Sequence, residues 1–315
     1  MLKKLSVLCA VCLALIASAS PIAKIPAKAG IVVYANVSEI IKYPLVQQFL
    51  GSVTLPPEIS INDFEGKVAL GASFTGDIKK EKNLAFNVVY QTAKPTAGKL
   101  FNLLSADAMK SGGAKKFKVG GKPAFGDDDA RAILVSPKEV ILQVRSGKYK
   151  FVNLKKSKNL LTNRPEVKNS TLVVAINTPE FASLASQKLK QNEQEVKDLL
   201  AGQKLAIGSL KLNADGSLAF ANQTLLVDAA ATQKVLAISK QSIEDLKKDP
   251  AAAAILEKVS VTSKGNTVTI SGKFSAMEVQ GAIAQIMMMV SKLNAPARQA
   301  SAPAAPAAPA APVAK

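Results

Sequence analysis

Residues 31–39 read IVVYANVSE, a stretch that predicts a buried strand leading into a helix. The first five residues are β-branched, aromatic or small, as is typical of strands, and Ser38 is of a type that commonly caps the start of a helix. The pattern returns 141 residues later, where residues 171–180 read TLVVAINTPE. Both stretches contain Val-Val, then Asn, then Glu at equivalent positions. This recurrence predicts two similar units, each opening with the same strand-to-helix step.

Hydrophobic periodicity on either side of these stretches predicts a similar order of elements in each unit. In the first unit we expect strands over 68–74 and 84–90, a helix over 95–110, and strands over 115–120, 131–136 and 140–145. In the second unit we expect a long helix ending near residue 202, strands over 205–212 and 217–227, helices over 228–248 and 250–256, strands over 258–263 and 267–274, and a final helix over 275–293. Asp215-Gly216 is a strong hairpin signal between two of these strands.

This order, β-α-β-β-α-β-β, predicts an α+β protein made of two tandem, duplicated units at 30–160 and 165–294. Tight hairpins indicate two antiparallel sheets, one in each unit, with the helices on one face. The order resembles a ferredoxin-like unit with an extra strand, which is an architectural analogy without functional content. A second short match, between Ser146–Tyr149 and Ser271–Phe274, adds to the expectation of a duplication. Two unrelated halves with chance matches are the alternative.

The two ends of the chain have compositions of their own. Residues 1–19 have two lysines near their start, at positions 3 and 4, continue through an uncharged run and finish at a small-x-small site, which is the layout of a secretory signal peptide. Lipidation at Cys12 and a later cleavage at 27–29 are alternatives. No other segment has enough consecutive apolar residues to span a membrane, so no transmembrane segment is expected after cleavage. Residues 295–315 repeat Ala and Pro, which predicts a disordered tail that is either an inert spacer or a tether.

The composition excludes much of enzyme chemistry. The chain of 315 residues contains no histidine, and its two cysteines, Cys9 and Cys12, lie inside the predicted signal peptide. Zinc, copper and non-haem iron sites depend on imidazole or thiolate ligands, and Ser-His-Asp and Cys-His machinery needs a histidine. We therefore expect no cofactor, no metal site and no catalysis. The alternative is a histidine-free hydrolase of the cell envelope that works through carboxylates, with Asp127–Asp129 as the first candidate catalytic residues.

The charge balance is strongly basic, since 41 lysines and arginines stand against 23 acidic residues and the formal net charge is +18. Lysine supplies nearly all of this charge, whereas bidentate reading of bases relies on arginine, so sequence-specific nucleic-acid binding is not expected. Two dense lysine runs, one around Phe117 and one around Tyr149 and Phe151, form the candidate site for polyanion binding. Their members are Lys115, Lys116, Lys118 and Lys122 in the first run, and Lys148, Lys150, Lys155, Lys156 and Lys158 in the second. A solvated edge, on which lysine prevents aggregation, is the alternative.

These features predict a non-catalytic, exported protein of the bacterial periplasm or cell surface that acts as a binding or structural module. A short signal and an Ala/Pro tail are typical of bacterial proteins. The expected partner is an anionic envelope polymer or another protein. The expected attraction to polymers is weak and salt-sensitive, because exposed charges more than ~10 Å apart are screened at about 0.1 M salt.

Overall fold

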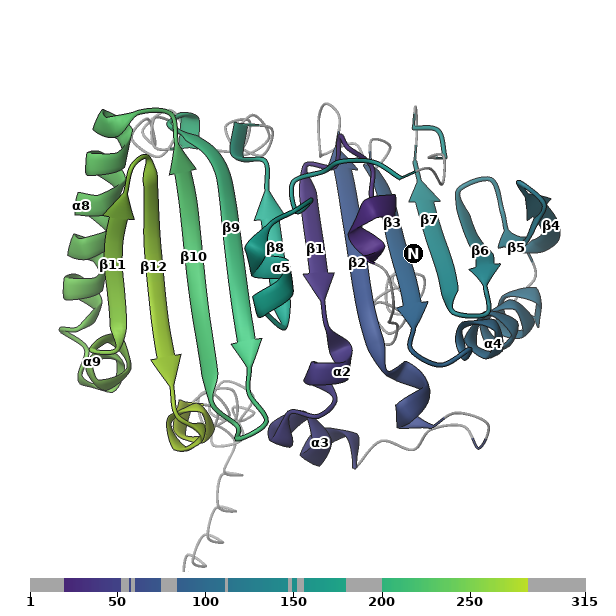
Figure 1. The fold of residues 1–315 in the computed structure, drawn as a ribbon, viewed down its shortest axis with the longest axis horizontal. Helices are drawn as coiled ribbons and strands as arrows, with labels where there is room; N and C mark the ends of the chain where they lie inside the picture. The colour runs from purple at the N-terminus through teal and green to yellow at the C-terminus, as the bar shows by residue number, and fades with distance from the viewer. Residues whose placement is uncertain are drawn as a thin grey trace, which may run out of the picture.

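The computed structural model describes residues 20–51, 57, 60–74, 84–110, 113–146, 149–151, 156–179 and 200–282. Twelve strands within these ranges form one antiparallel sheet with the order β11-β12-β10-β9-β8-β1-β2-β3-β7-β6-β5-β4 (Figure 1). The strands are β1 (Ile31–Ala35), β2 (Gly66–Phe74), β3 (Leu84–Thr92), β4 (Lys115–Val119), β5 (Lys122–Gly126), β6 (Ala130–Ser136), β7 (Glu139–Arg145), β8 (Leu172–Ile176), β9 (Gln203–Leu212), β10 (Leu218–Leu226), β11 (Val259–Lys264) and β12 (Thr267–Phe274). The predicted mixture of antiparallel strands and a few helices is confirmed.

The helical elements lie mostly between strands. They are η1 (Pro21–Lys24), α2 (Val37–Ile40), α3 (Pro44–Leu50), η2 (Ile61–Phe64), α4 (Ala97–Lys110), α5 (Pro165–Asn169), α8 (Ala229–Leu246) and α9 (Pro250–Leu256). Asp228 caps α8 as predicted, because its carboxylate accepts a hydrogen bond from the Ala231 amide at 2.8 Å. Among the residues just given, no helix is long and apolar enough to cross a membrane. The described residues do not include the predicted signal peptide or the Ala/Pro tail, and they include only the last residues of the helix expected to end near residue 202.

The two predicted sheets are in fact one, which corrects the sequence-based expectation. Strands β1 and β8 pair antiparallel at the middle of the sheet and join its two halves. The ladder continues beyond the strands, where the Asn36 amide donates to the Thr171 carbonyl and the Asn177 amide donates to the Gly30 carbonyl, each at 2.7 Å. A strand at the edge of a sheet has unpaired N–H and C=O groups. Pairing β1 with β8 removes one such edge from each half.

The strand order also differs from the ferredoxin-like analogy. A split β-α-β arrangement places another strand between the two that a helix connects. Here β1 and β2 are connected through α2 and α3 yet pair directly and antiparallel. In the second half the order β8-β9-β10-β12-β11 likewise keeps β8 beside β9. Each half is therefore mainly a meander of neighbouring strands.

The first half of the sheet is covered on both faces, whereas helices on one face were predicted. Val88 and Tyr90 of β3 belong to the core under α4, and Val89 between them belongs to a second core on the opposite face. Ile22 and Ile25, in the segment that begins with η1, fill this second core. Sequence patterning missed this layer because a four-residue 3-10 turn has no helical periodicity to recognise.

The second half is closed by α8 and by a turn that docks against the first half. Leu226, Val235 and Val268 form the core between α8 and the sheet. The predicted Asp215-Gly216 turn joins β9 to β10, and Gly216 has a φ of +86°, a conformation that favours glycine. The Tyr43 hydroxyl, just before α3, donates a buried 2.7 Å hydrogen bond to the Gly216 carbonyl. This bond ties the two halves together at the lower end of the sheet in Figure 1.

Candidate polyanion-binding surfaces

The first lysine run lies on β4 and at the start of β5, which form a hairpin at the outer edge of the sheet. Lys115, Lys116, Lys118 and Lys122 are all exposed, and Phe117 is 37% exposed. Because side chains alternate along a strand, Lys116 and Lys118 project from the face opposite to Phe117. The predicted interleaving of cations with an aromatic ring therefore does not bring these two lysines onto the ring.

The second lysine run follows β7. Lys150, Lys156 and Lys158 are exposed, whereas Lys148 and Lys155 lie outside the described residues. The segment is anchored on η1, where the Ser157 amide donates to the Ala23 carbonyl at 2.7 Å and the Asn159 amide side chain donates to the Ile22 carbonyl at 2.6 Å. These lysines therefore cross the covered face of the first half, while those of the first run lie along the edge strand.

None of the seven described lysines of the two runs forms an ion pair with another described residue.

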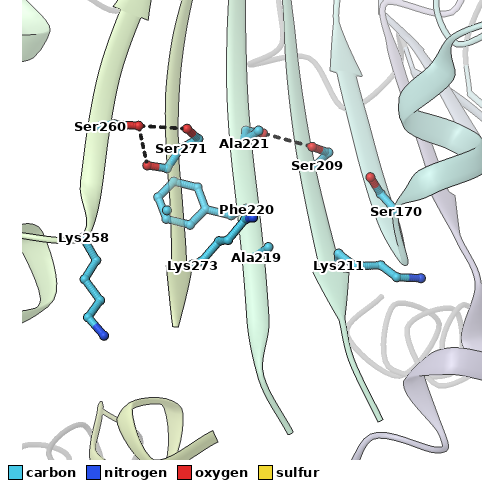
Figure 2. A pocket seen from close by; sticks show the side chains of 11 residues that line it. Ser170, Ser209, Lys211, Ala219, Phe220, Ala221, Lys258, Ser260, Ser271 and Lys273 are labelled. Atoms are coloured by element: carbon cyan, nitrogen blue, oxygen red, sulfur yellow. Dashed lines mark hydrogen bonds between the residues drawn. The ribbon is translucent and has the colours of Figure 1, made fainter. Parts of the chain in front are cut away.

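The structure adds a third basic surface that the sequence analysis missed, a shallow groove on the second half of the sheet (Figure 2). Its volume is about 550 Å³. Small side chains form its floor, because Ser209, Ala221, Ser271 and Ser260 face one another across β9, β10, β12 and β11. Three lysines lie beside this row: Lys211, Lys273 and Lys258.

A sequence signal for the groove existed. The pattern Ser-x-Lys occurs at 209–211 and 271–273, and its reverse, Lys-x-Ser, occurs at 258–260. A spacing of two residues places Ser and Lys on the same face of a strand. Recognising the site also required the register between strands, which the sequence does not state.

Carboxylates offset most of the positive charge of the groove. Lys211 pairs with Glu39 at 2.9 Å, and Lys258 pairs with Glu278. The hydrogen bond from Lys258, together with those from Ser275, lowers the pKa of Glu278 to about 2. Lys273 has no ion-pair partner in the part of the chain that the structure describes. Counted over the described residues, the groove therefore has one lysine without an ion pair, fewer than either lysine run has.

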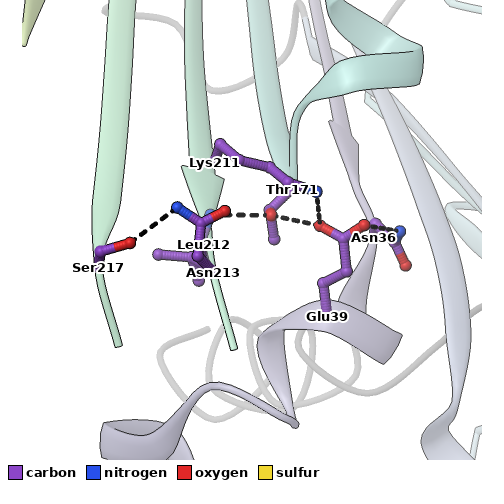
Figure 3. Close-up of polar contacts among 7 residues, drawn as sticks. All are labelled: Asn36, Glu39, Thr171, Lys211, Leu212, Asn213 and Ser217. Carbon is purple, nitrogen blue, oxygen red and sulfur yellow. Dashed lines mark hydrogen bonds and ion pairs between the residues drawn. The ribbon is translucent and has the colours of Figure 1, made fainter. Parts of the chain in front are cut away.

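Glu39 is the centre of a polar network where the two halves meet (Figure 3). Its carboxylate accepts hydrogen bonds from Asn36 at 2.9 Å, from Lys211 at 2.9 Å and from the hydroxyl of the fully buried Thr171. Burial alone would raise the pKa of Glu39, but the bonds from Thr171 and Lys211 and the charge of Lys211 hold it below its ordinary value. Thr171 also accepts from the Leu212 amide at 3.0 Å. The network connects α2 to β8 and β9 and has a structural role.

The acidic cluster Asp127–Asp129 forms the turn between β5 and β6. The Asp127 carboxylate accepts from the amides of Asp129 at 2.9 Å and Ala130 at 2.7 Å. The turn begins after Gly126, whose φ of +146° is a conformation that glycine adopts readily. Within the described ranges, no group of three metal-ligating side chains comes together here or elsewhere.

The fold defines a class in general terms: an α+β protein dominated by one large antiparallel sheet. No protein-family profile matches the sequence, and no curated protein matches it. Among solved structures, crystal form I of TP0453 is similar over 85% of this chain and 98% of that chain, at 13% sequence identity and a TM-score of 0.47. Crystal form III of TP0453 is similar over 85% of this chain and 99% of that chain, at 11% identity and a TM-score of 0.44.

Proposed function

We propose that the protein is a non-catalytic, exported protein of the bacterial periplasm or cell surface, a binding or structural module that attracts an anionic envelope polymer or a protein partner. The observation that carries this proposal is the set of exposed lysines in the two runs, which have no ion-pair partners among the described residues. A Lys-rich surface of this kind attracts polyanions without selecting a sequence.

The edge strand β4 is the best location for such binding. Its lysines serve two purposes at once, because lysine on an edge strand blocks pairing with other chains and also concentrates positive charge. Since Lys116 and Lys118 point away from Phe117, their contribution is charge rather than cation–π stacking. Charge alone gives weak attraction that salt screens readily.

The geometry gives no support to a carboxylate-dependent hydrolase. Such an enzyme needs one carboxyl group free to act as a base and another to act as an acid. The Asp127 carboxylate already accepts two main-chain hydrogen bonds in its turn. Asp128 and Asp129 are exposed to solvent beside it.

We also infer that the two units, 30–160 and 165–294, arose by duplication. Val33 pairs with Val174 at the centre of the β1–β8 ladder, and these two residues are equivalent in the 141-residue repeat. The neighbouring pairs are also exchanged by the repeat, as a two-fold axis through the Val33–Val174 pair requires. The proposed ancestor is therefore a symmetric dimer joined through this strand.

The second sequence match does not add to this inference. The strand pairing can be followed from Val33 across the first half of the sheet and from Val174 across the second half. Arg145 of β7 and Lys273 of β12 are then at equivalent positions. Ser146 is therefore equivalent to Phe274, three residues away from the Ser271 that sequence matching assigned to it. The Ser-Gly-Lys match at this place is a coincidence of composition.

A charge-matched comparison tests the binding proposal. In the test variant, the four lysines of the first run become glutamine (Lys115→Gln, Lys116→Gln, Lys118→Gln, Lys122→Gln). In the control, four exposed lysines elsewhere are replaced in the same way (Lys204→Gln, Lys234→Gln, Lys240→Gln, Lys264→Gln). Binding to alginate, a polymer of uronic acids, is measured at low salt. We expect the test variant to bind more weakly than the control, and equal losses would show that net charge alone matters and contradict the proposed site.

A further inference from the structure

Two arginines on neighbouring strands converge on one aromatic ring. Arg131 of β6 and Arg145 at the end of β7 place their guanidinium carbons 4.0 and 4.7 Å from the centre of the Phe151 ring. Both arginines project from the same face of the sheet, because Arg131 is directly opposite Gln143 and Arg145 follows Gln143 by two residues. The chain has four arginines in all, so two of them meet at this ring.

Among the described residues, every hydrogen-bond acceptor of the two guanidinium groups is neutral. Arg131 donates through Nε and Nη2 to the Gln143 side-chain oxygen at 2.9 and 2.7 Å. Arg145 donates through Nε to the main-chain carbonyl of Asp128 at 2.7 Å and through Nη1 to that of Tyr149 at 3.2 Å. Among the described residues, no carboxylate lies within ion-pair distance of either arginine, although Asp128 is next to Arg145 through its backbone.

Two adjacent cations without a counter-ion are electrostatically unfavourable. Partial burial and, after it, the charge of Arg145 lower the pKa of Arg131. The environment on the sheet side is fixed, since Gln143 is 2% exposed and donates to the buried Asn87 at 2.8 Å. The arginines are therefore held in place by neutral partners, and an anion that bridges them would relieve their repulsion.

We propose that Arg131 and Arg145, stacked on Phe151, bind a phosphate group. Arg131 Nη1 and Arg145 Nη2 make no hydrogen bond with the described residues, so each guanidinium keeps a donor for a ligand. A phosphate monoester carries a charge between about −1.5 and −2 and three acceptor oxygens, which matches two guanidinium groups. A carboxylate has one charge and two oxygens, which a single guanidinium saturates in a bidentate pair.

This proposal rests on the proposed function and deepens it, because it names the chemistry that one anion site would recognise. The exposed Lys150 immediately precedes Phe151 and adds positive charge beside the site. The phosphate can be free or can belong to a lipid headgroup, and both sources offer the same terminal oxygens to the arginines.

Isothermal titration of the full chain with inorganic phosphate at low salt tests the site. We expect saturable binding that weakens about tenfold or more in the variant Arg131→Lys with Arg145→Lys, because lysine lacks the planar fork through which arginine donates charged hydrogen bonds to an anion. The matched control, Lys204→Gln with Lys234→Gln, lies outside both lysine runs, removes more charge and is expected to change binding by about twofold at most. The absence of saturable phosphate binding to the wild type, or equal binding by the wild type and the arginine variant, overturns the proposal.

Further measurements verify the fold of the variants and identify the source of the phosphate. Circular dichroism and thermal unfolding verify the fold, and the single variant Arg145→Lys replaces the double variant where the latter does not fold. Sedimentation with vesicles that contain phosphatidic acid, with and without free phosphate as competitor, distinguishes a lipid headgroup from free phosphate as the source. A chain that binds alginate through its lysines but does not bind phosphate contradicts this inference and leaves the proposed function standing.

Discussion

Replacement of Gly71 by alanine tests the layer of chain that covers β2. A Cβ atom at this position would overlap Ile25 Cγ2 and lie 3.3 Å from Ala29 Cβ and 3.6 Å from Ile25 Cβ. Carbon atoms prefer separations of about 3.5–4.0 Å, so the segment 20–29 must move away from the sheet. Ile25 is completely buried, and insertion of a methyl group into such a core typically costs about 1–3 kcal/mol.

A double-mutant cycle measures whether this overlap is the cause. Ile25→Ala alone leaves a cavity and is expected to cost roughly 2–5 kcal/mol. In the double variant the new methyl group occupies part of that cavity. The loss of unfolding free energy in the double variant should therefore be smaller than the sum of the two single losses, by about 1 kcal/mol or more. The assay is urea unfolding followed by circular dichroism, which suits a chain without tryptophan.

Gly208→Ala in β9 is the matched control, because a Cβ atom there meets nothing within 4 Å. We expect it to be neutral or slightly stabilising, since alanine loses less backbone freedom than glycine on folding. Strict additivity of Gly71→Ala and Ile25→Ala, or a Gly71→Ala variant as stable as Gly208→Ala, would refute the described packing of the segment on β2.

Three further substitutions probe the junction and the turns. Glu39→Gln should cost about 1 kcal/mol of unfolding free energy at neutral pH for this half-buried group. Because folding lowers the pKa of Glu39 from the ordinary 4.5, the carboxylate stabilises the fold above that pH, and the difference in stability from wild type should vanish as pH falls through the folded pKa. A stability difference that does not depend on pH between 7 and 3 contradicts the network. Tyr43→Phe leaves the buried Gly216 carbonyl without its donor and should cost about 1–2 kcal/mol in urea unfolding, and a neutral result would mean that this contact does not join the halves. Gly126→Ala forces a residue with a Cβ into a left-handed conformation and against the Ala130 carbonyl, so we expect a loss of about 1–3 kcal/mol, and an unchanged unfolding midpoint contradicts the tight turn.

Local patterns were sufficient to predict most individual elements. Alternating apolar residues in 68–74 and 84–90, the Asp228 cap and the Asp215-Gly216 turn are local features, and each appears in the structure near the predicted place. The pairing of β1 with β8 could not be predicted in the same way, since an exposed edge and a paired strand have the same alternation. The layer around Ile25 was missed because its backbone follows no regular period.

The candidate sites also differ in whether local sequence features were sufficient to predict them. The exposed lysines on β4 were predicted because runs of like charge stay in solvent whatever the fold. The groove beside Lys211 and Lys273 depends on cross-strand register, and the meeting of Arg131, Arg145 and Phe151 depends on how the chain folds back after β7. Spacing along one segment contains neither kind of information.

The most direct test of the proposed function is the salt dependence of binding to alginate. The dissociation constant of the full chain is measured at a series of salt concentrations from about 10 to 300 mM, over which the Debye length shortens from roughly 30 Å to below 10 Å. If exposed lysines without counter-ions attract the polymer, the affinity falls continuously as salt rises, and the fall is shallower in the variant that lacks the four lysines of the first run. An affinity that stays constant over this range would contradict the account, because it would require a contact that does not depend on those charges.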